Sequence, residues 1–131
     1  MLADRREVAA IFVGGAIGGA ARTGIVQVAP VHAGAWPWTT FLINVSGCLM
    51  LGYLVTRLQE RLPITAYRRP LLGTGLCGAL TTFSTFQLEL VRLFGRHDWL
   101  LAFAYAAASV AAGFAALALG TALVRRARLT W

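Results

Sequence analysis

Long runs without a charged residue constrain this chain more than any other feature of its sequence. The runs cover Val8–Ala21, Thr23–Thr56, Pro70–Leu88 and Trp99–Val124. The last three runs are long enough to cross a bilayer as a helix, which takes roughly 20 residues. A soluble helix carries charges on its exposed face, so a chain patterned in this way is predicted to lie in a membrane.

The runs predict an all-α membrane protein, with four transmembrane helices in one domain that covers residues 1–131. Proline, glycine and histidine cluster between residues 30 and 37 and must form a turn, so the second run contributes to two spans. Arg22 then lies near the end of the first span, where its long side chain can reach the headgroups. The expected spans are about 7–29, 36–57, 69–93 and 98–124.

All twelve basic residues are arginine, and their distribution predicts the orientation of the chain. Four spans place both termini on one side, which carries nine arginines, while the opposite side carries Arg92 and Arg96, with Arg22 at a span end. The excess favours both termini in the cytoplasm. Because the arginines lie in short links between apolar runs, nucleic-acid binding is not expected.

Small residues predict close helix contacts in the first and fourth spans. The first contains Gly14, Gly15, Gly18 and Gly19, and the fourth contains the stretch Ala106–Gly113, in which nearly every residue is small. Helices in lipid associate by close van der Waals contact, which small residues permit. A dimer interface is one explanation, and packing within a single four-helix bundle is the alternative.

Three spans carry rows of polar or aromatic side chains at helical spacing. The rows are Thr40 with Asn44 in the second span, Thr82 with Thr85 and Glu89 beside Phe83 and Phe86 in the third, and Tyr105 with Ser109 in the fourth. Hydroxyls often bond to carbonyls of their own helix, and an asparagine can simply hold two helices together. Polar groups in hydrocarbon need partners or a wet cavity, and rows in three spans favour a pathway.

The third span is predicted to break near its middle. Gly75 and Gly78 each weaken a helix by about 1 kcal/mol relative to alanine, and Thr81 and Thr82 follow with poor helix propensity. A break around residues 76–81 would expose carbonyls at the end of one half-helix and amides at the start of the next. Carbonyls suit a small cation and amides an anion, so we expect an ion site or a tight partner contact there.

The donors along these rows carry no full charge, which favours an anion as the permeant species. Besides amide and hydroxyl groups, the ring edges of Phe83 and Phe86 carry partial positive charge. A cation would prefer ring faces or carboxylates, and none of the five acids lies at mid-span, Glu89 being the nearest. Weak donors let an anion lose its water and still leave again. The residues alone therefore predict a pathway for a small anion.

Each span also carries a motif. The motifs are Gly15–Arg22 in the first span, Phe41–Gly47 in the second, Gly78–Phe86 (GALTTFSTF) in the third, and the pair Tyr105 and Ser109 in the fourth. Together they resemble the small fluoride-channel family, the Fluc or CrcB proteins, and the third motif is highly specific. The resemblance implies an antiparallel dimer with two narrow pores that exports cytoplasmic fluoride passively. It also implies a multi-pass protein of a prokaryotic inner membrane.

The resemblance further implies roles for individual residues along the anion path. Phe83 and Phe86 would contact fluoride through their ring edges, and Asn44 would donate a hydrogen bond to it. A polar track would continue through Ser84, Thr85, Tyr105 and Ser109, and Thr40 would lie close to the anion path. Arg22 would lie by a vestibule, and Glu89 would lie near the end of the track.

Sodium and a second subunit are the other partners that the resemblance implies. Backbone carbonyls of Gly78 and Thr81 from both subunits would surround one structural sodium ion on the two-fold axis, with no organic cofactor. Homodimers that insert in both orientations usually have little charge bias, whereas this chain has nine arginines against three. Either the bias is tolerated in a homodimer, or the partner is a sister subunit of opposite orientation.

Three other classes of protein fit the sequence less well. A small proton-coupled exporter with four helices needs a carboxylate inside the membrane, and the first span has only Glu7 at its margin. A non-transporting assembly subunit would leave the polar rows unexplained. An enzyme is not expected, because the sequence has no recognisable triad, metal cluster or activated nucleophile.

Overall fold

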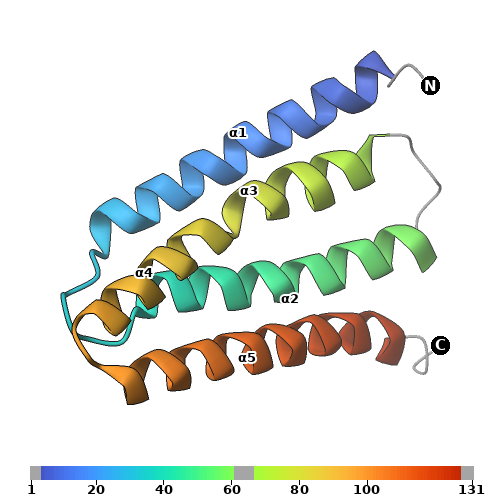
Figure 1. Ribbon diagram of the computed structural model, residues 1–131. Helices are drawn as coiled ribbons and strands as arrows, with labels where there is room; N and C mark the ends of the chain where they lie inside the picture. Colours follow the sequence, from blue (N-terminus) through green and yellow to red (C-terminus); the bar gives the residue numbers. More distant parts are fainter. Residues whose placement is uncertain (1–3, 61–66, 128–131) are drawn as a thin grey trace.

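The computed structural model describes residues 4–60 and 67–127, which form six helical segments (Figure 1). The segments are α1 (Arg5–Val28), α2 (Trp38–Glu60), the π-helix η1 (Pro70–Cys77), α3 (Gly78–Leu80), α4 (Phe83–Gly95) and α5 (Trp99–Arg126). No strand is found within the two described ranges. Helices α1, α2 and α5 are long and apolar enough to cross a membrane, in agreement with three of the four expected spans. Two residues of the arginine count, Arg61 and Arg128, lie outside the described ranges.

Caps and short connections set the ends of these helices. The Asp4 carboxylate accepts a hydrogen bond from the Arg6 backbone N–H at 3.0 Å and so begins α1. After α1, the Thr39 hydroxyl donates to the Ala29 carbonyl at 2.5 Å and ties the loop to the start of α2. Between α4 and α5, His97 adopts a left-handed conformation with φ of 63°. The loop and this turn lie at one end of the molecule, opposite the termini (Figure 1).

The third helix is broken, as predicted, but its form differs from the prediction. The expected break covered residues 76–81, whereas the helical path continues through Leu80 and only Thr81 and Thr82 are extended, with ψ of 154° and 118°. Helix α4 restarts where the Thr82 hydroxyl accepts a hydrogen bond from the Thr85 N–H at 3.2 Å. The wide turns of η1 were not foreseen, because a π-helix has no distinct hydrophobic pattern in a uniformly apolar stretch.

Glycines bring η1 into backbone contact with α1. Gly14 and Gly18 are buried on α1, and a Cβ at Gly18 would overlap the carbonyl of Leu76. From the other side, a Cβ at Gly75 would lie 2.7 Å from the Ile11 carbonyl oxygen. This row of small residues in the first span therefore packs within the chain. Packing within one bundle was the alternative that the sequence left open beside a dimer interface.

Helix α2 lies between the broken helix and α5 (Figure 1). It packs closely against α5. A Cβ at Gly52 would overlap the carbonyl of Leu117, and one at Gly120 would overlap that of Leu49. The second glycine row of α1 is different, since no atom lies within 4 Å of a Cβ built at Gly15 or Gly19. That row remains available for a contact outside the chain.

We predict that Gly18→Ala destabilises the protein, because the new methyl group would press against the backbone of η1 and overpacking typically lowers stability by about 1–3 kcal/mol. Gly24→Ala is the matched control, since the same change in the same helix meets no atom within 4 Å. Thermal unfolding of both variants in detergent measures the difference. A Gly18→Ala protein as stable as Gly24→Ala would contradict the close contact.

Candidate functional site

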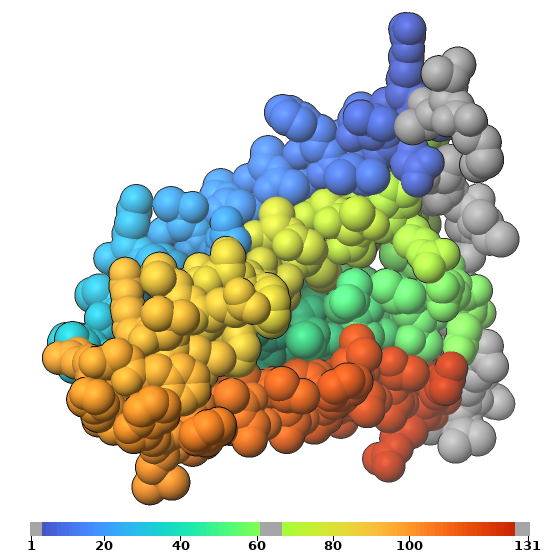
Figure 2. Space-filling view, viewed as in Figure 1, coloured from blue at the N-terminus to red at the C-terminus, as the bar shows by residue number. Residues whose placement is uncertain are grey.

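A pocket of about 340 Å³ lies beside the helix break, between α2, the broken helix and α5. Figure 2 shows the hollow between the yellow segment around the break and the orange-red α5, with green α2 at its floor. Seven residues singled out from the sequence line it: Asn44, Gly78, Thr81, Thr82, Phe83, Phe86 and Ser109. The fold thus brings together residues of three predicted spans around one cavity.

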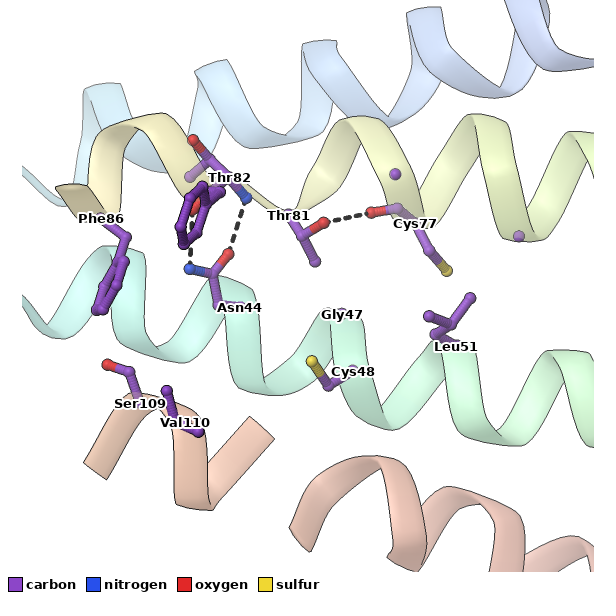
Figure 3. Close-up of a pocket in the computed structure, with 13 residues that line it drawn as sticks. Asn44, Gly47, Cys48, Leu51, Cys77, Thr81, Thr82, Phe86, Ser109 and Val110 are labelled. Carbon is purple, nitrogen blue, oxygen red and sulfur yellow. Dashed lines mark hydrogen bonds between the residues drawn. The ribbon is translucent and has the colours of Figure 1, made fainter. Parts of the chain in front are cut away.

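Asn44 stabilises the broken conformation of the helix through two hydrogen bonds to the backbone of Thr82 (Figure 3). Its Nδ2 donates to the Thr82 carbonyl at 3.0 Å, and its Oδ1 accepts from the Thr82 N–H at 2.8 Å. The side chain thereby replaces the partners that an unbroken helix would give to this residue. One N–H of the Asn44 amide is left over for another acceptor. The residue is thus both a helix clamp and a remaining donor at the pocket.

The same interaction releases backbone carbonyls at the end of α3. In a continuous helix the Thr82 N–H would donate to the Gly78 carbonyl, but here it donates to Asn44. The extended ψ of 154° at Thr81 also turns its carbonyl away from the helical direction. Gly78 is exposed on this chain, and a Cβ built there would meet only the Gly73 carbonyl oxygen, at 4.0 Å. The break thus changes the hydrogen bonding of the backbone at Gly78, a residue on the exposed surface of this chain.

Phe83 and Phe86 form an aromatic wall at the pocket. Their ring centroids are 6.0 Å apart and their planes are inclined by 30°. Phe86 also packs against the ring of Tyr105 at 5.2 Å, whereas Phe83 is 71% exposed. Rings in this arrangement can turn their electropositive edges toward the cavity.

Glu89 lies deeper than its place in the sequence suggested. It is 6% exposed, and its two carboxylate oxygens accept hydrogen bonds from the Thr40 hydroxyl at 2.6 Å and the Tyr105 hydroxyl at 2.7 Å. Both donors were predicted in separate polar rows, of the second and fourth spans. The buried carboxyl group joins these two rows through two short hydrogen bonds.

Tyr105 connects this network to the pocket. It is completely buried, and Ser109 follows one turn later on α5, where it lines the pocket. The Ser109 hydroxyl is buried beside Tyr105 at the pocket. Trp36, which the sequence analysis did not single out, packs edge-on against Tyr105 at 5.4 Å. Its signal was the Trp-Pro-Trp sequence at the start of the second span.

Three of the predicted residues belong neither to the lining of this pocket nor to the network around Glu89. Ser84 is exposed near the Thr82 hydroxyl, at 3.4 Å, and Thr85 is bonded to that same hydroxyl at 3.0 Å. Arg22 is half-buried on α1, which contributes no residue to the pocket. Hydroxyl groups in the first turn of α4 interact with the hydroxyl of the N-cap residue Thr82. Helical spacing alone could not distinguish such a hydroxyl from one that faces the cavity.

The fold and the site define an α-helical, multi-pass membrane protein with uncharged donors around an intramembrane cavity. The chain belongs to the CrcB family: the family described as "CrcB-like protein, Camphor Resistance (CrcB)" matches residues 9–121. This membership agrees with the resemblance that the four motifs indicated.

Curated relatives carry one functional name. A protein named fluoride-specific ion channel FluC 1, from Mycolicibacterium paratuberculosis, is 52% identical over 126 residues, which cover 96% of both chains. A fluoride-specific ion channel FluC from Chloroflexus aurantiacus is 43% identical over 91% of this chain and 95% of its own. FluC 2 from Nocardia farcinica is 39% identical over 93% of this chain and 87% of its own. An ion channel is not a class of enzyme.

We predict that Asn44→Ala destabilises the fold, because it leaves the buried N–H and carbonyl of Thr82 without partners and each such group typically costs about 1–3 kcal/mol. Ser46→Ala is the control, since the Ser46 hydroxyl bonds only to the Ile43 carbonyl of its own helix. Amide hydrogen exchange at Thr82 should accelerate in Asn44→Ala alone. Unchanged exchange would contradict the clamp.

Proposed function

We propose that this protein is a fluoride-selective channel through which cytoplasmic fluoride leaves the cell down its gradient. The observation that carries the proposal is the pocket at the helix break, where uncharged donors from three segments meet. It is supported by membership of the CrcB family and by relatives that are named fluoride-specific ion channels. Passive export would lower the concentration of a toxic anion inside the cell.

The donors along the path explain how a small anion could lose its water without being trapped. The remaining N–H of Asn44, the Ser109 hydroxyl and the edges of Phe83 and Phe86 are weak donors around one cavity. Neutral dipoles offset the loss of hydration water, whereas a fixed cation at the same depth would hold the anion. The Thr40 and Tyr105 hydroxyls would extend the track, but in this conformation both donate to Glu89.

The proposal also includes a membrane topology and places for the other predicted residues. The segments η1, α3 and α4 together form the fourth crossing, with both termini on one side of a prokaryotic inner membrane. Ser84 and Thr85, near the restart of the helix, would join the polar track only after leaving the Thr82 hydroxyl, which they approach in this conformation. Arg22 and Glu89 lie at its vestibules.

An antiparallel dimer would complete the site. Phe83 is 71% exposed at the edge of the pocket, and the glycine row of Gly15 and Gly19 has no neighbour within the described chain. A second copy packed on this surface would cover Phe83 and close one wall of each of two pores. The partner is a second copy of this chain or, given the arginine bias, a sister subunit of opposite orientation.

A structural sodium ion fits the break. The released carbonyl of Gly78 and the turned carbonyl of Thr81 are the hard oxygen ligands that such a cation prefers, and half-helix carbonyl ends hold sodium in other membrane proteins. In the described ranges no cluster of three His, Cys, Asp or Glu side chains competes for a metal ion. Two copies would supply four carbonyls, and the bound ion would fix the two breaks to each other.

A proton-coupled exporter is the second candidate, because Glu89 is a buried carboxylate. Both oxygens of this carboxylate already accept hydrogen bonds from protein hydroxyls, and Glu89 does not line the pocket at the helix break, which argues against a coupling role there. Fluoride flux that requires a pH gradient would favour the exporter over the channel.

We predict that Phe83→Ile and Phe86→Ile each abolish fluoride efflux from liposomes, because isoleucine has no electropositive ring edge, while the oligomeric state is retained. Phe12→Ile is the matched control, as Phe12 is 75% exposed on α1 and lies outside the pocket. A fluoride electrode follows efflux, with chloride efflux measured in parallel. Full flux in both pocket variants would remove the rings from the mechanism.

We also predict that sodium stabilises the dimer. The purified protein should unfold at a higher temperature in sodium chloride than in N-methylglucamine chloride of equal ionic strength, because binding to the assembled state alone shifts its stability. The same measurement on Gly78→Val tests the site, since a side chain beside the released carbonyl should remove the difference. A melting temperature that is independent of the cation would contradict the sodium site.

A further inference from the structure

A second pocket, of about 370 Å³, opens at the end of the molecule that holds the α1–α2 loop and the α4–α5 turn. We call it the basic pocket, and it is lined by Val31, His32, Ala33, Glu89, Arg92, Leu93 and Arg96. Two arginines face one carboxylate among these lining residues, so the formal charge of the lining is +1 when His32 is neutral. The pocket therefore combines a cavity with an excess of positive charge.

The two guanidinium groups are placed by the fold and are not neutralised by it. Arg92 lies in the last turn of α4 and Arg96, four residues later, is its C-cap, and both line this pocket. Gly34 turns the loop toward this face with φ of 81°, and a Cβ built at Gly34 would lie 3.7 Å from Nη1 of Arg96. Neither arginine makes a side-chain hydrogen bond or ion pair with any residue that the structure describes. Both charges therefore remain available to a soluble anion.

Glu89 makes this pocket the entrance to the polar network. Its carboxylate lines the basic pocket and also accepts the hydrogen bonds from Thr40 and Tyr105. One turn beyond Tyr105, Ser109 lines the pocket at the helix break. Glu89, Tyr105 and Ser109 thus lie between the two arginines and the aromatic wall.

We propose that the basic pocket is an anion-capture site, in which Arg92 and Arg96 concentrate small inorganic anions at the Glu89 end of the path. This inference rests on the proposed function, for which fluoride is the anion that matters. Both arginines are exposed to water, where two unit charges at 4 Å interact by only about 1 kcal/mol. Such a site raises the local concentration and the entry rate of an anion without holding it.

The inference is tested by fluoride currents in planar bilayers, with an impermeant salt to set the ionic strength. At about 0.01 M ionic strength the Debye length is about 30 Å, and at about 1 M it is about 3 Å. We expect Arg92→Gln/Arg96→Gln to lower the current several-fold at low ionic strength and to match the unaltered protein at high ionic strength. Arg92→Lys/Arg96→Lys, which keeps the charges, should retain most of the current.

Arg68→Gln/Arg69→Gln is the matched control, because it removes the same charge from exposed positions that line neither pocket. An equal loss in this control would overturn the inference, since only the total charge would then matter. A loss in Arg92→Gln/Arg96→Gln that persists at high ionic strength would also overturn it, because altered packing would be the cause. An unaltered protein without any fluoride current would instead contradict the proposed function itself.

Discussion

The paired hydrogen bonds between the Asn44 side chain and the Thr82 backbone are the interaction on which the pocket depends. A membrane-embedded helix cannot leave an N–H and a carbonyl without partners, because no water is present to satisfy them. The clamp allows the third helix to break and restart, and it thereby frees the Gly78 carbonyl. Asn44 thus satisfies the backbone at the break and also leaves two groups that an ion could contact, an amide N–H and the Gly78 carbonyl.

Glycine contacts fix where this clamp lies. Gly18 and Gly75 hold η1 against α1, and Gly52 and Gly120 hold α5 against α2. Side chains longer than a hydrogen atom would push the helices apart at each of these points. The close backbones bring Ser109 on α5 and Phe86 on α4 to the same cavity. The small residues therefore position the site as well as stabilise the bundle.

Much of the architecture could be predicted, because the length of a membrane span and the spacing of residues on a helix face can both be read from short stretches of sequence. The spans of α1, α2 and α5 follow from run lengths, and the broken third helix follows from the positions of glycine and threonine. Helical spacing grouped the polar residues on faces of single helices, but only the structure shows which of them meet at one pocket. The role of Asn44 as a clamp could not be predicted, because its partner Thr82 is 38 residues away. The burial of Glu89 was missed for the same reason, since its donors come from two other helices.

The sequence by itself determined that this protein lies in a membrane, that it is all-α, and which residue types are available to contact an anion. These properties depend on composition and local periodicity, which any conformation of the chain retains. Only the tertiary structure decided that Thr40 and Tyr105 donate to one carboxylate and that Ser84 and Thr85 lie away from the cavity. It also decided that Arg92 and Arg96 share a pocket with the loop after α1. Such pairings require the helices to approach with a particular rotation and depth, and both are set by close packing between segments distant in the chain.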